Sequence, residues 1–191
     1  ESMMYLRKVK EKLLDLKERY FKYGCLAKHA IRFQDPFEGI RSYSQKIEAD
    51  LIVMGSQGLS DFEEMIIGSN TEKVVRTSDI PVIVVKRDSE KFKLKDLVYA
   101  SDFQEENKES FRKFLDFAKM FKSKVHLLKV NTVSKFENSS VSRQKIKDFI
   151  NGYELPRNTI NVYNDSSVVK GITNFSKEIN ADLIGLTTHG R

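Results

Sequence analysis

Cysteine is almost absent from this sequence of 191 residues, and long hydrophobic runs are missing. Cys25 is the only cysteine, so no disulfide can form within the chain, and a reducing compartment is favoured. The longest apolar runs, such as Leu51–Met54, are far shorter than the roughly 20 residues that cross a bilayer. The first residues form a charged amphipathic segment and not a signal peptide. We therefore expect a cytoplasmic protein with no membrane partner.

Residue patterns typical of catalysis, metal binding and nucleic-acid binding are also lacking. His29, His126 and His189 are too far apart in sequence for metal-ligand spacing, and a lone histidine is usually structural. No local pattern indicates an activated nucleophile. The 33 basic side chains are interspersed with 27 acidic ones, so the net charge of +6 indicates solvated helix faces rather than a nucleic-acid interface. We expect no catalytic residue and no protein-held metal.

A loop bordered by glycines is the most informative pattern that is present. The buried strand predicted over Leu51–Met54 runs into Gly55-Ser56-Gln57-Gly58, and Gly68-Ser69 opens the helix predicted over Asn70–Arg76. Glycine lets the backbone approach an anion closely, and the free N–H groups at a helix start attract negative charge. The pattern predicts a phosphate-binding loop and therefore a nucleotide site.

Two features of this loop leave alternatives open. Ser69-x-x-Glu72 also fits a capping box, in which both side chains satisfy N–H groups at the helix start without any ligand. The loop further carries Asp61, Glu63 and Glu64, whose charges oppose a triphosphate unless Mg²⁺ bridges them. A bound nucleotide would thus be expected to need Mg²⁺ more than usual.

Hydrophobic periodicity predicts an α/β fold. Apolar residues from Leu6 to Tyr20 recur at steps of three and four, which marks an amphipathic helix, whereas short continuous apolar runs suit strands covered on both faces. We expect parallel sheets built from βαβ units. Besides Leu51–Met54 the predicted strands are Gly24–Ile31, with Cys25 buried, and Val82–Val85, Asp96–Ser101, Lys124–Val130, Thr159–Tyr163 and Asp182–Leu186; later helices are predicted over Glu105–Phe121, Val141–Tyr153 and Ser167–Ile179.

An internal repeat predicts two copies of one domain. Shifting the chain by 132 residues aligns Gly39–Gly58 with Gly171–Gly190, with nine of twenty positions identical. A period this long indicates a duplicated domain and not a solenoid. We therefore expect two tandem, doubly wound, Rossmann-like parallel-sheet domains at residues 1–88 and 92–191. In that register the first copy lacks its opening strands, and the second lacks its phosphate loop and last strand, so a longer polypeptide is expected.

The glycine spacing resembles a known family. Gly55-x2-Gly58-x9-Gly68-Ser69, with Thr71-Glu72 inside the helix and Pro81–Val85 as a closing strand, is similar to the ATP-binding signature of the universal stress protein family. The resemblance implies an adenine-nucleotide alpha hydrolase-like fold and a non-catalytic ATP-binding module that acts in the stress response through a partner. Weak ATP hydrolysis stays open. It also implies pairing of the last strand between tandem copies or across a homodimer.

The resemblance assigns roles to seven residues. Gly55 and Gly58 would border the ribose and phosphates, and Gly68, Ser69 and Asn70 would hold the phosphate tail. Asp102 would lie beside the nucleoside and Val130 against adenine, although Asp102 could equally cap the helix that follows it. The second copy carries Thr187 where the first has Gly55, which predicts a weak or degenerate second site.

Two other functions remain open at this point. One is an enzyme of related fold that cleaves ATP to adenylate a substrate, which would want a Ser-Gly-Gly motif after the first strand; the second copy has Tyr99–Phe103 there instead. The other is a scaffold whose nucleotide site has degenerated.

Overall fold

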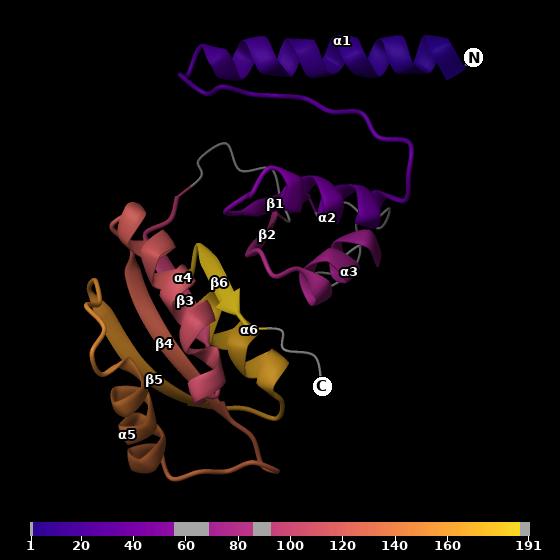
Figure 1. Ribbon diagram of the computed structural model, residues 1–191. Coiled ribbons are helices and arrows are strands. Elements are labelled where there is room, and N and C mark those ends of the chain that lie inside the picture. Colours follow the sequence, from indigo (N-terminus) through magenta and orange to yellow (C-terminus); the bar gives the residue numbers. More distant parts are fainter. Residues whose placement is uncertain (1, 56–68, 86–92, 188–191) are drawn as a thin grey trace. The chain divides into compact units, whose positions relative to one another are not determined.

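The computed structural model describes residues 2–55, 69–85 and 93–187 (Figure 1). The chain divides into two compact units, Glu1–Ala49 and Asp50–Arg191, which we describe separately. The predicted domain boundary, between residues 88 and 92, lies outside the described residues and stays a prediction.

The first unit contains two helices. Helix α1 (Ser2–Phe21) confirms the helix that the spacing of the apolar residues predicts. Helix α2 (Pro36–Lys46) begins with proline, and Asp35 caps it by accepting hydrogen bonds from the backbone N–H groups of Phe37 at 3.0 Å and Glu38 at 3.3 Å. Proline in the first turn and aspartate at the cap are both favourable, because neither leaves a donor unsatisfied.

The predicted strand over Gly24–Ile31 is wrong. These residues have no regular secondary structure, and Cys25 is exposed rather than buried. Gly24 takes φ +78°, its N–H donates to Phe21 O at 2.9 Å, and the N–H of Cys25 donates to Tyr20 O at 3.2 Å. This pair of bonds is a Schellman motif, so Gly24 and Cys25 end helix α1 instead of opening a strand.

The second unit contains a four-stranded parallel sheet in the order β5-β4-β3-β6 (Figure 1). The strands are β3 (Asp96–Ala100), β4 (Lys124–Asn131), β5 (Asn158–Asn164) and β6 (Leu183–Leu186), each within one or two residues of its predicted bounds. Three α-helices alternate with them: α4 (Lys108–Met120), preceded by the 3₁₀ turn η1 (Glu105–Asn107), then α5 (Ser139–Ile150) and α6 (Val168–Glu178). Their predictions are confirmed.

Helices cover both faces of this sheet. On one face, Tyr99 and Leu127 pack with Phe111 of α4 and Phe149 of α5. On the other face, Val98 and Leu128 pack with Phe175 of α6. Side chains on both faces of β3 and β4 are buried, which explains why the sequences of these strands are continuous apolar runs. The four-stranded sheet and its helices thus form a three-layer α/β structure.

A smaller parallel sheet joins β1 (Ile52–Gly55) to β2 (Val82–Val85), with Ile52 opposite Val82. Helix α3 (Ser69–Thr77) lies between them in sequence, and its residues Thr71 and Val74 are buried. This is the βαβ order that the glycine pattern predicts.

Local structure repeats at the same interval as the sequence. Helices α2 and α6 have bounds that differ by 132 residues at both ends. Glu48 and Asn180, also 132 residues apart, both take φ +51° directly after these helices. Ala49 and Ala181 each donate their N–H at 2.9 Å to a serine carbonyl, that of Ser44 or Ser176. Identical residues therefore coincide with identical C-terminal caps.

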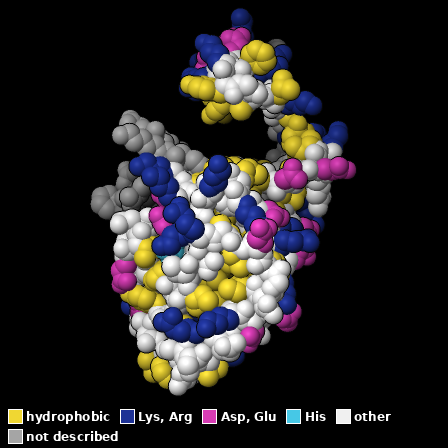
Figure 2. Space-filling view, turned by 90° about the vertical axis from the view of Figure 1, so that its left-hand side faces the viewer, with side chains coloured by type: hydrophobic (Ala, Val, Ile, Leu, Met, Phe, Trp, Pro, Cys, Tyr) yellow, Lys and Arg dark blue, Asp and Glu magenta, His cyan; other side chains and the backbone are white. Residues whose placement is uncertain are grey.

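The surface carries charges of both signs. Figure 2 shows basic and acidic side chains interspersed over the face that it presents, with apolar side chains between them. No helix in the described part of the chain is long and apolar enough to cross a membrane.

Candidate functional site

The strand order of the larger sheet singles out one position on its edge. From β3 the chain continues to β4 and β5 on one side, and then returns to β6 on the other side. In open parallel sheets, ligands bind beyond the carboxyl ends of the strands where the order reverses. Here that point lies between β3 and β6, and Asp102 follows β3 directly beside it.

Asp102 is exposed and fixed by hydrogen bonds. Its Oδ1 accepts from Asn107 Nδ2 at 2.8 Å and from the backbone N–H of Gln104 at 3.4 Å. These bonds close a turn before η1, whose capping residue is Gln104 and not Asp102, so the alternative that Asp102 caps the following helix is not reproduced. Among the described residues nothing bonds the second oxygen of Asp102, Oδ2, which leaves that oxygen available to a ligand.

Val130 lies on the neighbouring strand at the same edge. The register pairs Ala100 with Leu128, and the N–H of Ser101 donates to Leu128 O at 3.1 Å, which places Asp102 and Val130 at matching positions beyond that pair. Val130 packs on the α6 side of the sheet, next to Gly171. A Cβ on Gly171 would stand 2.5 Å from Val130 Cγ1, so glycine permits this close approach.

The glycine-rich group belongs to the smaller sheet. Gly55 is the last residue of β1, and Thr71 Oγ1 in the first turn of α3 donates to Gly55 O at 3.4 Å. Ser69 and Asn70 are exposed at the start of α3. Gly58 and Gly68 lie outside the described residues. The described site residues thus form two groups, one on each sheet.

Among the described residues, no capping-box hydrogen bond joins Ser69 and Glu72. Ser69 is the first described residue of helix α3. The carboxylate of Glu72, which a capping box would turn back toward the helix start, instead accepts from Arg76 Nη1 at 3.5 Å. The acidic side chain in this first turn is thus offset by a cation.

Comparison with known proteins shows which family the chain resembles. The model of the universal stress protein family matches residues 1–86, which are less than half of the chain. Universal stress protein MJ0577 of Methanocaldococcus jannaschii is 36% identical over 78 residues, which are 41% of this chain and 48% of that protein. Stress response protein NhaX of Bacillus subtilis is 44% identical over 52 residues, 27% of this chain and 31% of that protein. The chain spans at most about half the length of these relatives.

Solved universal stress proteins share the fold. A universal stress protein from Archaeoglobus fulgidus superposes with a TM-score of 0.75 over 94% of this chain and 66% of that chain, at 23% identity. A putative universal stress protein from Pseudomonas aeruginosa superposes with a TM-score of 0.70 over 93% and 66%, at 15% identity. These similarities support the α/β fold of the whole chain.

The sequence patterns do not single out Asn107, which contacts Asp102 in the folded chain. It is only 4% exposed and holds Asp102, although nothing in its neighbourhood marks it as part of a site. An asparagine at the start of a helix usually caps that helix, so its side-chain partner could be found only from the folded structure.

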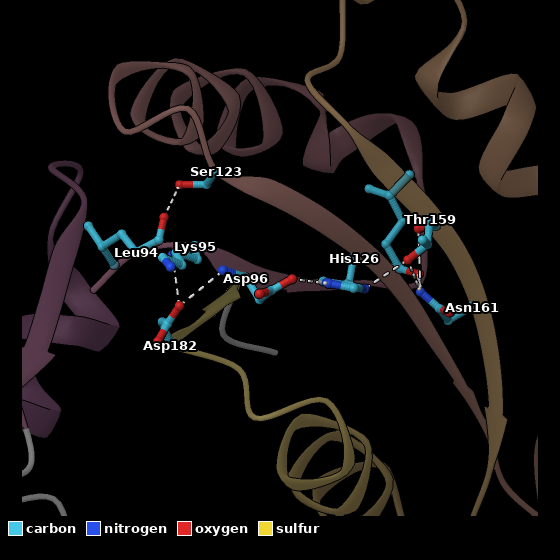
Figure 3. Close-up of polar contacts among 9 residues, drawn as sticks. Leu94, Lys95, Asp96, Ser123, His126, Thr159, Asn161 and Asp182 are labelled. Atoms are coloured by element: carbon cyan, nitrogen blue, oxygen red, sulfur yellow. Dashed lines mark hydrogen bonds and ion pairs between the residues drawn. The ribbon is translucent and has the colours of Figure 1, made fainter. Parts of the chain in front are cut away.

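A polar chain crosses the opposite, amino-terminal edge of the larger sheet (Figure 3). His126 on β4 is 5% exposed; its Nε2 lies 3.0 Å from Asp96 Oδ1 and its Nδ1 lies 2.8 Å from Thr159 Oγ1. Asp182, before β6, accepts from the N–H groups of Lys95 at 2.7 Å and Asp96 at 3.0 Å. His126 is thus a satisfied structural histidine, as a lone histidine was expected to be.

A charged cluster centred on Glu137 fixes the loop after β4. The Glu137 carboxylate accepts from Lys129 and Lys145, and from Ser142 Oγ at 2.7 Å. These donors lower the pKa of Glu137 to about 2, the bond from Lys129 contributing most. The Glu137 carbonyl also accepts from Asn131 Nδ2 at 2.8 Å. The cluster therefore ties the loop to β4 and α5.

Proposed function

We propose that this chain carries two tandem universal stress protein domains that form a non-catalytic adenine-nucleotide-binding module. The observation that carries the proposal is the hydrogen bond from Thr71 to Gly55, which holds the start of α3 against the carboxyl end of β1. Glycines flank this junction in sequence at the spacing of the family signature. Bound ATP would alter how the module contacts a protein partner in a stress response.

The residues at this junction fit a phosphate group. Ser69 and Asn70 in the first turn of α3 are exposed, and the free N–H groups at a helix start attract an anion. Nothing in the described part of the chain lies within 4 Å of the point where a Cβ on Gly55 would stand. The phosphates of ATP would bind here, with Gly58 and Gly68 completing the loop and Mg²⁺ bridging to its carboxylates.

The tandem arrangement is supported by the repeated caps at α2 and α6, described above. In the second copy, Asp102 and Val130 lie at the edge of the sheet where a nucleoside would bind. Self-association through β2, between copies or across a homodimer, is part of the proposal because β2 pairs only with β1 among the described strands.

A second candidate is a scaffold whose second site has degenerated. One observation favours it: Thr187 follows β6 where Gly55 ends β1, so the second copy has a side chain where the first copy has none. In that case the second copy would contribute packing and partner contacts without nucleotide.

Calorimetric titration of the full chain with ATP, ADP and GTP, each with Mg²⁺, tests the proposal. We expect ATP and ADP to bind, GTP to bind at least about tenfold more weakly, and no ADP to accumulate from ATP during the titration. Thr71→Val should weaken ATP binding, whereas Thr77→Val, at the far end of the same helix, should not. Absence of adenine-nucleotide binding would refute the proposal of a nucleotide-binding module. Steady release of ADP would show that the chain is an enzyme that hydrolyses ATP.

A further inference from the structure

We propose that Asn107 is a positioning residue that holds Asp102 so that its free carboxylate oxygen meets a hydrogen-bond donor of the bound nucleoside. The inference rests on the proposed function, and it adds to it the residue that orients the nucleoside contact. Three observations around the Ser101–Asn107 segment carry it.

The first observation is the direction of the Asn107 side chain. Asn107 precedes α4 at the capping position, yet its side chain makes no capping hydrogen bond to that helix. Its backbone angles of φ −86° and ψ −3° are helical, unlike the extended angles of a capping asparagine. The side-chain amide donates to Asp102 Oδ1 at 2.8 Å instead.

The second observation is that Asn107 is itself rigidly held. It is 4% exposed, and its carbonyl oxygen accepts from Tyr99 Oη at 3.4 Å. Tyr99 belongs to β3 and is 1% exposed, with its ring 4.9 Å from that of Phe111. Asn107 thereby links the core of the sheet to the exposed carboxylate at the sheet edge.

The third observation is the conformation of the turn that carries Asp102. Phe103 takes φ +59°, a left-handed conformation that is unusual for a bulky residue. Its ring is buried, with edge-on contacts to Tyr99 and Phe149, and its N–H donates to Ser101 Oγ at 3.0 Å. Strained turns persist where the surroundings hold them in place, and they gather at ligand sites.

These contacts leave one oxygen of Asp102 for a ligand. Oδ1 is shared by Asn107 and the Gln104 N–H, while Oδ2 has no partner among the described residues and Asp102 is exposed. An ionised carboxylate only accepts hydrogen bonds, so its complement is a hydroxyl or amino group. The ribose hydroxyls and the adenine amino group of adenosine are donors of this kind, and adenosine contains no phosphate that could obscure the contact.

Adenosine titrations of the full chain and its variants test the inference. We expect Asn107→Ala to weaken adenosine binding about five- to tenfold, because Asp102 loses its support. In an Asp102→Ala background the same substitution should change the affinity less than about twofold, since Asn107 acts only through Asp102. Gln104→Ala is the matched control: it removes a neighbouring side chain but keeps the backbone N–H that donates to Asp102.

The outcomes separate the inference from the proposed function. If the unmutated chain binds neither adenosine nor ATP, the proposed function fails and the inference falls with it. If the unmutated chain binds adenosine and Asn107→Ala binds it equally well, or loses the same factor with and without Asp102, Asn107 is merely structural and the inference alone is overturned. Urea unfolding of each variant shows whether a loss of affinity reflects a loss of fold.

Discussion

At the scale of single residues, two glycines at equivalent positions of the repeat have different surroundings. Gly171 in α6 meets Val130, whose Cγ1 and Cγ2 would stand 2.5 and 3.0 Å from an added Cβ. The three atoms nearest to a Cβ added at Gly39 in α2 all belong to the side chain of Gln34, the nearest at 3.3 Å. Close packing therefore requires glycine at position 171, whereas position 39 has more room for a side chain.

The matched pair Gly39→Ala and Gly171→Ala measures this difference. Alanine favours a helix by about 0.5–1 kcal/mol over glycine, so Gly39→Ala should leave the free energy of unfolding unchanged or raise it. Gly171→Ala should lower it by about 1–3 kcal/mol, because Val130 must move. Urea unfolding followed by circular dichroism checks both, and equal effects would contradict the close packing of α6 on β4.

Residue chemistry was predictable where its effect is local. The glycine spacing and the apolar runs act over a few neighbours, so most of the strands and the helices between them follow from the sequence. The strand predicted to begin at Gly24 and Cys25 was wrong because the same residues can end a helix or begin a strand. The Asn107–Asp102 bond could not be foreseen, because an asparagine before a helix has a local alternative and only tertiary packing decides against it.

At the scale of elements, the loop between β4 and α5 depends on one carboxylate. Glu137 holds both Lys129 and Lys145, and these bonds lower its pKa from 4.5 to about 2. A carboxyl whose pKa is lower in the folded chain than in the unfolded chain stabilises the fold above the unfolded value. This stabilisation is present above pH 4.5 and is lost as the pH falls toward 2.

We expect Glu137→Gln to lower the free energy of unfolding at pH 7 by about 1–2 kcal/mol, after allowing for solvent screening of a partly exposed group. The difference from the unmutated chain should shrink as the pH falls from 4.5 toward 2, because protonation then removes the same charge in both proteins. Urea unfolding across this pH range provides the measurement. A difference that persists unchanged at the acid end would show that shape and not charge holds the loop.

At the scale of the whole molecule, the edge of the smaller sheet is the feature that bears on assembly. Among the described strands β2 pairs only with β1, and its residues are apolar: Val82, Ile83, Val84 and Val85. Unpaired backbone groups on an apolar edge invite pairing with another strand. The family resemblance implies such pairing, which the present structure leaves as a proposal.

Val84→Asp should abolish self-association that depends on this edge, since a buried charge would oppose a second strand. Val133→Asp is the control, because Val133 is 93% exposed in the loop after β4 and adds the same charge elsewhere. Light scattering over a range of protein concentrations follows the mass of each variant. If the Val84→Asp protein associates like the control, β2 is not the joint.

Gly55→Val tests whether the carboxyl end of β1 and the start of α3 form a phosphate site. The described residues leave open space for this side chain, so the urea midpoint should not move, but the valine would occupy the place of the nucleotide. We expect calorimetric titration with ATP and Mg²⁺ to show binding by the unmutated chain and at least about tenfold weaker binding by Gly55→Val. Equal affinity in the two proteins, or no binding by the unmutated chain, would contradict the phosphate site.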